Sequence, residues 1–127
     1  MIVGLGIDAV GIERIRRLLE RHGERLVARC FATGEVRRPR DAQHVAGLLA
    51  AKEAAFKALG TGWSDGVSWR QVVVTRETNG QPGLRFEGAA ASRAVALGAD
   101  RQLVSITHDG GLAVAVVILE NTGVLQH

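Results

Sequence analysis

The sequence predicts an α+β fold in which an antiparallel or mixed sheet packs against one long helix and several short ones. Strand and helix patterns interleave along the chain, and tight-turn signals at Asn79-Gly80 and at residues 109–111 each join two strand-like segments. Such hairpins favour antiparallel pairing over a doubly wound parallel sheet. The 127 residues contain no internal repeat, low-complexity tract or linker, so we expect one domain over residues 1–127.

The first forty residues predict a strand, a helix and a loop. Residues 2–10 form the strand, because β-branched residues interleave with glycine and aspartate. An apolar stripe predicts a helix over 12–22, with Gly23 as its C-cap, and a short helical piece over 24–29. Residues 33–40 are polar and contain Gly and Pro, which predicts a loop.

The rest of the chain predicts two helices and two hairpins. Asp41 is suited to cap a long Ala- and Leu-rich helix that ends near Leu59. A second, shorter Ala-rich helix is expected to end at Gly98. The expected strands are 67–76 and 84–86 for the first hairpin, and 103–108 and 112–119 for the second.

Charge is distributed unevenly along the chain. The net charge is +3, but residues 1–40 contain nine Arg and five acidic residues, whereas the remainder contains seven basic and eight acidic residues. A basic end predicts an acidic partner, which can be a nucleic acid, a membrane surface or an acidic protein. The absence of Tyr and the scarcity of Phe and Trp leave no obvious platform for stacking bases, which disfavours nucleic acid.

Nothing in the sequence predicts a membrane span or a secretory signal. No apolar run approaches the roughly 20 residues that a spanning helix needs, and the first residues lack a basic segment and carry charges early. The one cysteine, Cys30, permits no intrachain disulfide. This suits a reducing compartment, so we expect a cytoplasmic protein.

Asp8 and Glu53 are acidic residues at positions that the pattern predicts to be apolar. Gly4, Gly6 and Asp8 share one face of the first strand, and a carboxylate there needs a cation, a partner or a helix N-terminus to cap. Glu53 lies among alanines and shares a helical face with Lys57, with which it can alternatively form a simple surface ion pair.

The lysines are conspicuous because the chain otherwise uses arginine. Lys52 and Lys57 are the only two, and a compact ammonium suits a phosphate. Two carboxylates suit Mg²⁺, which completes its shell with water and substrate phosphates, whereas one Cys and four His without ligand spacing disfavour Zn²⁺. Residues 60–62 offer backbone N–H groups for an anion.

Four motifs together resemble the holo-acyl-carrier-protein synthases, the small trimeric class of 4′-phosphopantetheinyl transferases. They are G-I-D-x-V-x-I-E-R-I at 6–15, A-A-K-E-A-x-x-K-A-L-G-T-G at 50–62, N-G-x-P at 79–82 and S-I-T-H-D-G at 105–110. The second is the most specific, and the match in order and spacing extends from residue 6 to about 119. The resemblance implies the fold of that class.

The resemblance also implies an activity: transfer of 4′-phosphopantetheine from coenzyme A to a serine of an acidic acyl carrier protein, with release of adenosine 3′,5′-bisphosphate. It implies Mg²⁺ on Asp8 and Glu53, and active sites between the subunits of a homotrimer. The remaining residues that match the family pattern are Lys57 near the diphosphate of coenzyme A; Gly60, Thr61, Gly62, Pro82 and His108 near the cofactor; and Arg14 at the carrier, joined on one helical stripe by Arg17 and Arg21. Glu53 and His108 are both candidates for the general base, and the role of Asp109 beside His108 stays open.

One departure from the family pattern concerns the segment before A-A-K-E-A. The family commonly has an arginine and an aromatic residue where this chain has Leu48 and Leu49. The resemblance therefore implies a weaker grip on coenzyme A at this point unless another arginine takes over. The alternatives to such an enzyme are a nucleic-acid-binding module, a non-catalytic homologue that binds the carrier, and a different Mg²⁺ enzyme acting on another diphosphate.

Overall fold

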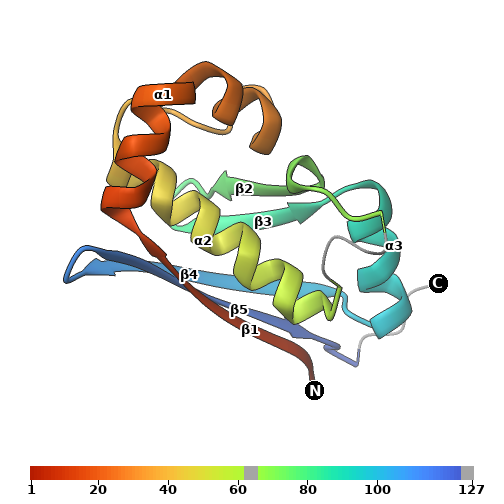
Figure 1. Ribbon diagram of the computed structural model, residues 1–127. Coiled ribbons are helices and arrows are strands. Elements are labelled where there is room, and N and C mark those ends of the chain that lie inside the picture. Colours follow the sequence, from red (N-terminus) through yellow and green to blue (C-terminus); the bar gives the residue numbers. More distant parts are fainter. Residues whose placement is uncertain (62–65, 124–127) are drawn as a thin grey trace.

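The computed structural model describes residues 1–61 and 66–123, and it confirms an α+β fold (Figure 1). The strands form two antiparallel sheets, one of three strands in the order β1-β5-β4 and a hairpin of β2 and β3. The elements in chain order are β1 (Ile2–Gly11), α1 (Ile12–Cys30), α2 (Ala42–Leu59), the 3₁₀-helix η2 (Trp69–Gln71), β2 (Val72–Arg76), β3 (Pro82–Phe86), α3 (Gly88–Leu97), β4 (Arg101–Asp109) and β5 (Leu112–Glu120).

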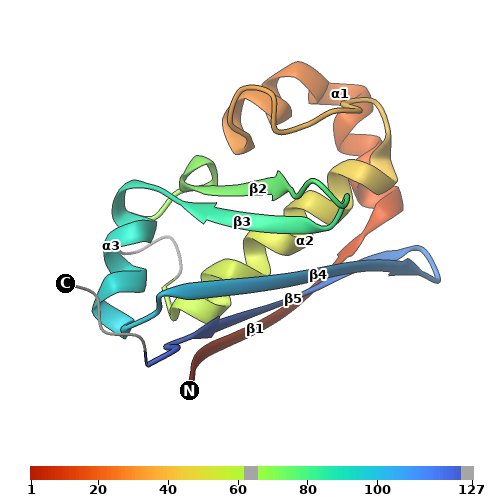
Figure 2. The same ribbon diagram turned by 180° about the vertical axis from the view of Figure 1, so that it is seen from behind.

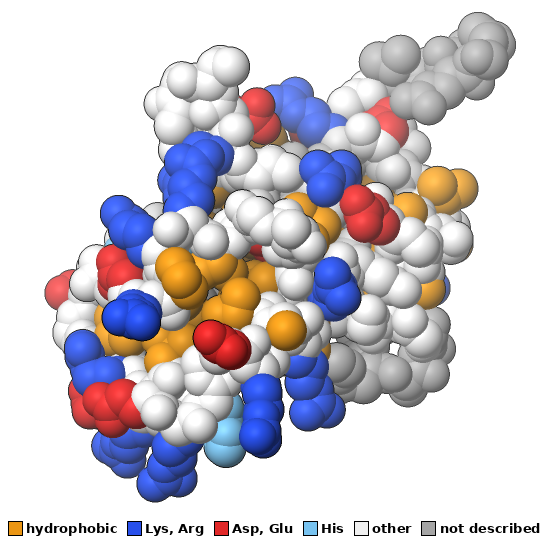
Figure 3. All heavy atoms as spheres, turned by 90° about the horizontal axis from the view of Figure 1, so that it is seen from above, with side chains coloured by type: hydrophobic (Ala, Val, Ile, Leu, Met, Phe, Trp, Pro, Cys, Tyr) orange, Lys and Arg blue, Asp and Glu red, His pale blue; other side chains and the backbone are white. Residues whose placement is uncertain are grey.

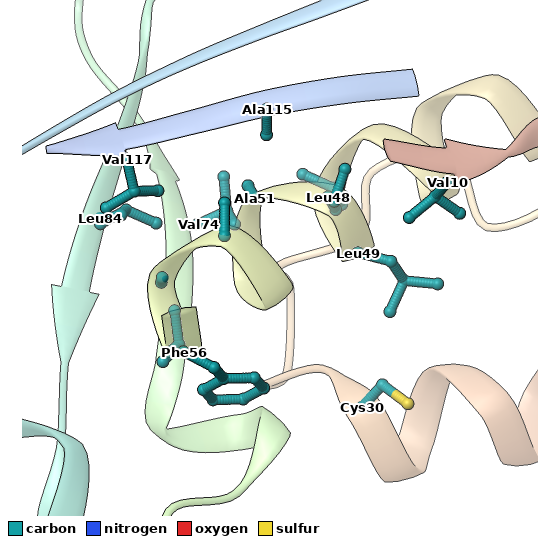
Figure 4. Close-up of a cluster of buried hydrophobic side chains, with 14 of the residues drawn as sticks. Val10, Cys30, Leu48, Leu49, Ala51, Phe56, Val74, Leu84, Ala115 and Val117 are labelled. Atoms are coloured by element: carbon teal, nitrogen blue, oxygen red, sulfur yellow. The ribbon is translucent and has the colours of Figure 1, made fainter. Parts of the chain in front are cut away.

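Helix α2 is the centre of the molecule. It lies along the inner face of the three-stranded sheet, and the β2–β3 hairpin and α1 cover its other sides (Figures 1 and 2). As expected, Asp41 caps its first turn by accepting a hydrogen bond from the N–H of His44 at 3.2 Å. The core around it is formed by small and medium apolar side chains, including Leu48, Leu49 and Val117 (Figure 4).

Strand β1 lies unusually close to α2 because two of its residues facing the helix are glycines. A Cβ atom built on Gly6 would lie 1.9 Å from the carbonyl oxygen of Ala54, and one on Gly4 would lie 2.3 Å from that of Ala58. No side chain fits in that space. The period of two along β1 therefore places Asp8, the next residue on the same face, directly against the helix.

Several expected boundaries are wrong by a few residues. The expected break between the helical pieces 12–22 and 24–29 is confirmed as a kink at His22 (φ −138°, ψ 22°), but the two pieces form one helix, α1, that runs to Cys30, and Gly23 is not a C-cap. The strand expected over 67–76 begins only at Val72, because the preceding three residues form η2. Within the described residues, no helix combines the length and the apolar character that crossing a membrane requires.

The close packing of β1 on α2 makes a stability prediction. Gly6→Ala should lower the free energy of unfolding by about 1–3 kcal/mol, because the added methyl group collides with helix backbone that cannot move alone. Gly23→Ala is the matched control: nothing lies within 4 Å of its Cβ position, and helix propensity should make it neutral or stabilising. Urea unfolding followed by circular dichroism measures both, and equal effects of the two substitutions would contradict the packing described.

Candidate active site

Three charged side chains from β1 and α2 meet where the strand packs on the helix. The Lys57 ammonium donates to Oδ1 of Asp8 at 2.8 Å and to the carbonyl oxygen of Ile7 at 3.1 Å. The carboxyl of Glu53, one helical turn before Lys57, lies close enough to that of Asp8 to donate to it when Glu53 is protonated. Asp8 is 12% exposed and Lys57 58% exposed, so this acidic pair lies at the edge of the core with the lysine on its solvent side.

Proximity of the two carboxyls shifts their titration in opposite directions. Burial raises the pKa of Glu53, and the hydrogen bond to Asp8 and the charge of Asp8 raise it further, to about 7, although Arg14 and Lys57 oppose the shift. Burial also acts to raise the pKa of Asp8, but its hydrogen bonds with Glu53 and Lys57 outweigh burial and lower it. The hydrogen bond that Lys57 donates to Asp8 raises the pKa of Lys57.

The acidic pair fits a hard divalent cation. Oδ2 of Asp8 is buried and has no hydrogen-bond partner, and a second carboxyl beside it binds a proton near neutral pH. A cation with oxygen ligands replaces that proton and satisfies both groups. Among the described residues no third His, Cys, Asp or Glu joins them, so water and substrate oxygens would complete the shell, as is usual for Mg²⁺.

Both simpler explanations of these residues are wrong. Asp8 does not cap the following helix, since the N-cap of α1 is Gly11 and receives no side-chain hydrogen bond. Lys57 bonds to Asp8 across the strand–helix contact, and its relation to Glu53 is therefore more than a surface pair on one helix.

His108 lies apart from this acidic pair within one chain. In the sheet, His108 on β4 pairs with Ala113 on β5, which pairs with Val10 on β1. His108 and Asp8 therefore lie on the two opposite edge strands of the three-stranded sheet. Two strand spacings, about 10 Å, separate these edges. His108 is exposed and its ring lies over Gly47, near the start of α2. Asp109 follows at the end of β4, where it is also exposed.

The segment after α2 departs from expectation at two positions. Gly60 is the left-handed C-cap of α2 (φ 70°), and its N–H donates to the carbonyls of Phe56 and Lys57. The N–H of Thr61 also donates to Phe56. Neither amide is free for an anion, because both close the end of the helix. Thr61 keeps a buried hydroxyl without a partner, and Gly62 lies outside the described residues.

Three arginines that the sequence analysis did not single out line a polar cavity of about 220 Å³. They are Arg37 in the loop before α2, Arg76 at the end of β2 and Arg85 on β3, and Leu48 forms part of the same wall. His44 adds no charge there: burial lowers its pKa, and its Nε2 accepts a hydrogen bond from the N–H of Arg37 at 3.3 Å. The cavity is therefore suited to an anion.

This cavity and the acidic pair lie on different sides of α2. The β2–β3 hairpin, which carries Arg76 and Arg85, flanks one side of the helix, and β1, which carries Asp8, flanks the other (Figures 1 and 2). Pro82 opens β3 at the end of the Asn79-Gly80 turn and is half-buried. A large ligand in contact with both regions of one molecule would have to pass around α2.

The expectation that Lys52 offers its charge to a phosphate is wrong. Its side chain is 0% exposed, and its ammonium is paired with the Glu35 carboxylate at 2.9 Å. It bonds in addition to the carbonyls of Trp69 and Val72. Of the two lysines, only Lys57 has access to solvent.

The face formed by α1 and the loop after it is basic around an apolar hollow. Figure 3 looks onto this face and shows blue Lys and Arg side chains around exposed apolar ones. The hollow has a volume of about 1030 Å³, and Leu19, Val27 and Phe31 contribute to its wall. Arg14, Arg17 and Arg21 are exposed on α1. Arg17 lies 4.0 Å from Glu13, and the charge of Arg14 acts on Glu53.

Comparison with known proteins gives a consistent result. The sequence model of the 4′-phosphopantetheinyl transferase superfamily matches residues 4–117. A holo-[acyl-carrier-protein] synthase of Halorhodospira halophila is 50% identical over 123 residues, which cover 94% of this chain and 98% of that protein.

Two solved structures show the same fold. The holo-[acyl-carrier-protein] synthase of Neisseria meningitidis superposes with a TM-score of 0.83 at 29% identity and covers 94% of this chain and 99% of its own. The synthase of Bacillus anthracis in complex with CoA (3′,5′-ADP) gives a TM-score of 0.76 at 32% identity and covers 96% of this chain and 99% of its own.

The raised pKa of Glu53 predicts how stability changes with pH in the absence of divalent metal. The pKa of the Glu53 carboxyl rises on folding from 4.5 to about 7. The free energy of unfolding therefore decreases as the pH increases from 4.5 to about 7, and this loss is constant at higher pH. Glu53→Gln removes this pH-dependent destabilisation. The free energy of unfolding of the variant, relative to that of the wild type, should therefore increase by about 1–2 kcal/mol between pH 5 and pH 8, a value discounted for partial exposure. Urea unfolding in EDTA measures the difference at each pH. A difference that stays constant with pH would rule out the coupled pair.

Proposed function

Because the chain belongs to the holo-[acyl-carrier-protein] synthases of the 4′-phosphopantetheinyl transferase superfamily, we propose that it transfers 4′-phosphopantetheine from coenzyme A to a serine of an apo-acyl carrier protein in a Mg²⁺-dependent reaction. Adenosine 3′,5′-bisphosphate is the second product. The convergence of Asp8, Glu53 and Lys57 is the observation that carries this proposal, since the three charges suit a cation and a diphosphate together.

The chemistry assigns a task to each of the three residues. The serine oxygen of the carrier attacks the β-phosphorus of coenzyme A, the bond from that phosphorus to the bridging oxygen breaks, and adenosine 3′,5′-bisphosphate leaves with the bond electrons. Asp8 and Glu53 would hold Mg²⁺, which would neutralise charge on the diphosphate and align its oxygens. Lys57 is the exposed cation beside that pair and stabilises negative charge on the leaving group.

The serine proton needs an acceptor, and two residues remain candidates. Glu53 would act indirectly, through a water in the shell of the cation that it helps to hold. His108 is exposed at the other edge of the sheet, so it can serve only a ligand that extends there from the acidic pair or a site shared with a neighbouring subunit. A pH–rate profile of His108→Ala distinguishes them, because the pKa on the acidic limb of the profile persists in this variant if Glu53 supplies the base.

Coenzyme A also presents phosphate at its nucleotide end, and the cavity of Arg37, Arg76 and Arg85 is suited to it. This cavity adjoins Leu48, where the family arginine is absent, so we assign the missing positive charge to these three arginines. Pro82 and the segment 60–62 remain proposed neighbours of the cofactor, but the amides of Gly60 and Thr61 are engaged in the helix cap and do not bind its phosphates. Replacing Arg85 by Gln should weaken coenzyme A binding more than binding of its 3′-dephospho form if this assignment is right.

The outer face of the three-stranded sheet supports a homotrimer with shared active sites. Leu5 and Ile7 on β1 are 64% and 60% exposed, and Leu103 on β4 is also exposed. A sheet face of this kind needs a partner to exclude water. Subunits packed through it would bring the β1 edge of one copy toward another copy, which offers a way to join an acidic pair to a distant His108.

An acidic carrier suits the basic face of α1. Arg14, Arg17 and Arg21 form the proposed contact, and attraction to an acidic partner speeds encounter more than it adds affinity. We propose that the enzyme acts in the cytoplasm, where it modifies acyl carriers for fatty acid biosynthesis.

Transfer itself is tested by intact mass spectrometry of an apo-carrier incubated with coenzyme A and MgCl₂. The wild type should add one phosphopantetheine mass, and Asp8→Asn should reduce the rate by at least about 100-fold, because it removes a ligand charge. Glu24→Gln, which removes an exposed carboxylate from the second half of α1, is the control and should keep full rate. A carrier left unmodified by the wild type would favour a non-catalytic homologue instead.

Arg21→Glu tests the carrier contact without altering the acidic pair. The KM for the carrier should rise about tenfold at low salt and the KM for coenzyme A should stay unchanged, because the substitution acts on encounter with an acidic surface. Steady-state kinetics at two NaCl concentrations measure both, and the difference should shrink at the higher one. A rise confined to coenzyme A would refute the docking role.

Leu5→Lys tests the proposed trimer. A charge in the middle of the apolar face should shift the mass seen by light scattering from three chains to one and abolish transfer with it. Arg101→Lys, on the exposed edge of β4, is the matched control and should leave the mass unchanged. A wild-type chain that is a monomer at micromolar concentration would refute the shared site.

A further inference from the structure

Lys52 and Glu35 form a buried ion pair that the proposed chemistry does not use. Both side chains are 0% exposed, and the ammonium lies 2.9 Å from Oε2 and 3.0 Å from Oε1 of the carboxylate. The Phe31 ring lies 4.9 Å from the ammonium. Burial of two charges costs several kcal/mol per ion unless hydrogen bonds satisfy every remaining polar position, so the other partners of the pair decide what it does.

Those partners are the backbone groups on the unpaired edge of β2. Glu35 Oε2 accepts a hydrogen bond from the N–H of Val74 at 2.7 Å, and Lys52 donates to the carbonyl of Val72. Among the residues that the structure describes, β2 pairs only with β3, on its other edge. The ion pair therefore takes the place of a neighbouring strand, with the acceptor opposite the N–H and the donor opposite the carbonyl.

The same pair ties together the loop before α2 and the turn before β2. Glu35 Oε1 accepts from the N–H of Ala32 at 2.9 Å, which fixes the loop, and Lys52 donates to the carbonyl of Trp69 at 2.9 Å, which fixes η2. Three separate segments of the chain are thus held to α2 by two side chains.

Two of these segments, the loop and β2, carry part of the proposed coenzyme A site. Arg37 lies two residues after Glu35 in the loop, and Arg76 lies two residues after Val74 on β2. Both line the polar cavity. On α2, Lys52 is followed directly by Glu53, so the residue that anchors the cavity wall is the neighbour of a carboxylate in the acidic pair.

We propose that Glu35 and Lys52 are positioning residues that fix the arginine-lined cavity relative to α2 and thereby set the affinity for the nucleotide end of coenzyme A. This inference rests on the proposed function. It predicts that the pair acts on cofactor affinity through the position of Arg37 and Arg76, and that it leaves the acidic pair on the opposite side of the helix in place.

The test compares Glu35→Gln with a control of similar stability. Gln keeps the length of Glu35 and one acceptor oxygen, but its NH₂ group meets either the Lys52 ammonium or a backbone N–H, and the lysine loses its counter-ion. Leu119→Ala, at a fully buried position near Gly4 and away from the cavity, should also destabilise the fold. Both are assayed well below their melting temperatures for transfer kinetics and, by calorimetry, for binding of 3′,5′-ADP without metal.

The expected result is selective. Glu35→Gln should raise the KM for coenzyme A and the Kd for 3′,5′-ADP about tenfold, the effect of misplacing about one charge-assisted contact, with kcat within about twofold of wild type. Leu119→Ala should leave all three unchanged. Equal binding by the two variants, or a loss confined to kcat, would overturn the positioning role.

Two further outcomes, an unfolded variant and an inactive wild type, can be distinguished from failure of the positioning role. If Glu35→Gln does not fold, Glu35→Asp replaces it, because the shorter carboxylate keeps the charge but cannot reach Val74 and Lys52 together; wild-type binding of 3′,5′-ADP by that variant would also overturn the inference. Absence of transfer by the wild-type chain would overturn the proposed function instead, and the 3′,5′-ADP titration would still decide whether the pair controls nucleotide affinity.

Discussion

The direct contact of β1 with α2 is the constraint on which the candidate site depends. Gly4 and Gly6 remove the side chains that would hold the strand away, and Ala54 and Ala58 provide the helix surface on which it lies. At this separation the next inward-facing residue, Asp8, reaches the helix at the level of Glu53. A wider separation of strand and helix, as side chains at these two positions would impose, would leave the two carboxyls too far apart to share a proton or a metal ion.

Lys52 and Glu53 are neighbours on α2, but the charge of Lys52 is fully paired and that of Glu53 is not. Lys52 points inward, where Glu35 neutralises it and backbone carbonyls satisfy its remaining hydrogens. Glu53 points to β1, where it meets a like charge and its pKa rises to about 7. The first arrangement stabilises the native state because it is complete. The second is incomplete without a cation, and strain of this kind is typical of functional sites.

Features of the structure that depend on the pattern within a single strand or helix could be predicted from the sequence. Periods of two and of 3.6 sufficed to place Asp8 inward on its strand and Glu53 and Lys57 on one helix face, and the structure joins these two local patterns through a single contact. The α+β fold was predictable for the same reason. The sequence pattern also indicated the interruption near His22. It did not reveal that the amides of Gly60 and Thr61 close the helix cap, because this depends on individual backbone angles and hydrogen bonds.

Residues brought together from distant segments could not be predicted. Arg37, Arg76 and Arg85 share no pattern in the sequence, and only the position of the hairpin beside α2 unites them. Glu35 is likewise one acidic residue in an Arg-rich loop, so no sequence pattern predicts its ion pair with Lys52. Without that partner, the sequence favours a phosphate as the ligand of Lys52. Burial decided that case, since a side chain with no exposed surface cannot meet a ligand.

The central claim is that Asp8 and Glu53 hold one divalent ion between them. Anomalous diffraction from crystals soaked in MnCl₂ tests it directly, because Mn²⁺ accepts the same oxygen ligands as Mg²⁺ and its position can be seen without modelling. The account predicts one strong peak within coordination distance of both carboxylates, which disappears in crystals of Asp8→Asn. A peak bound by only one of the two residues, or none at this place, would contradict it.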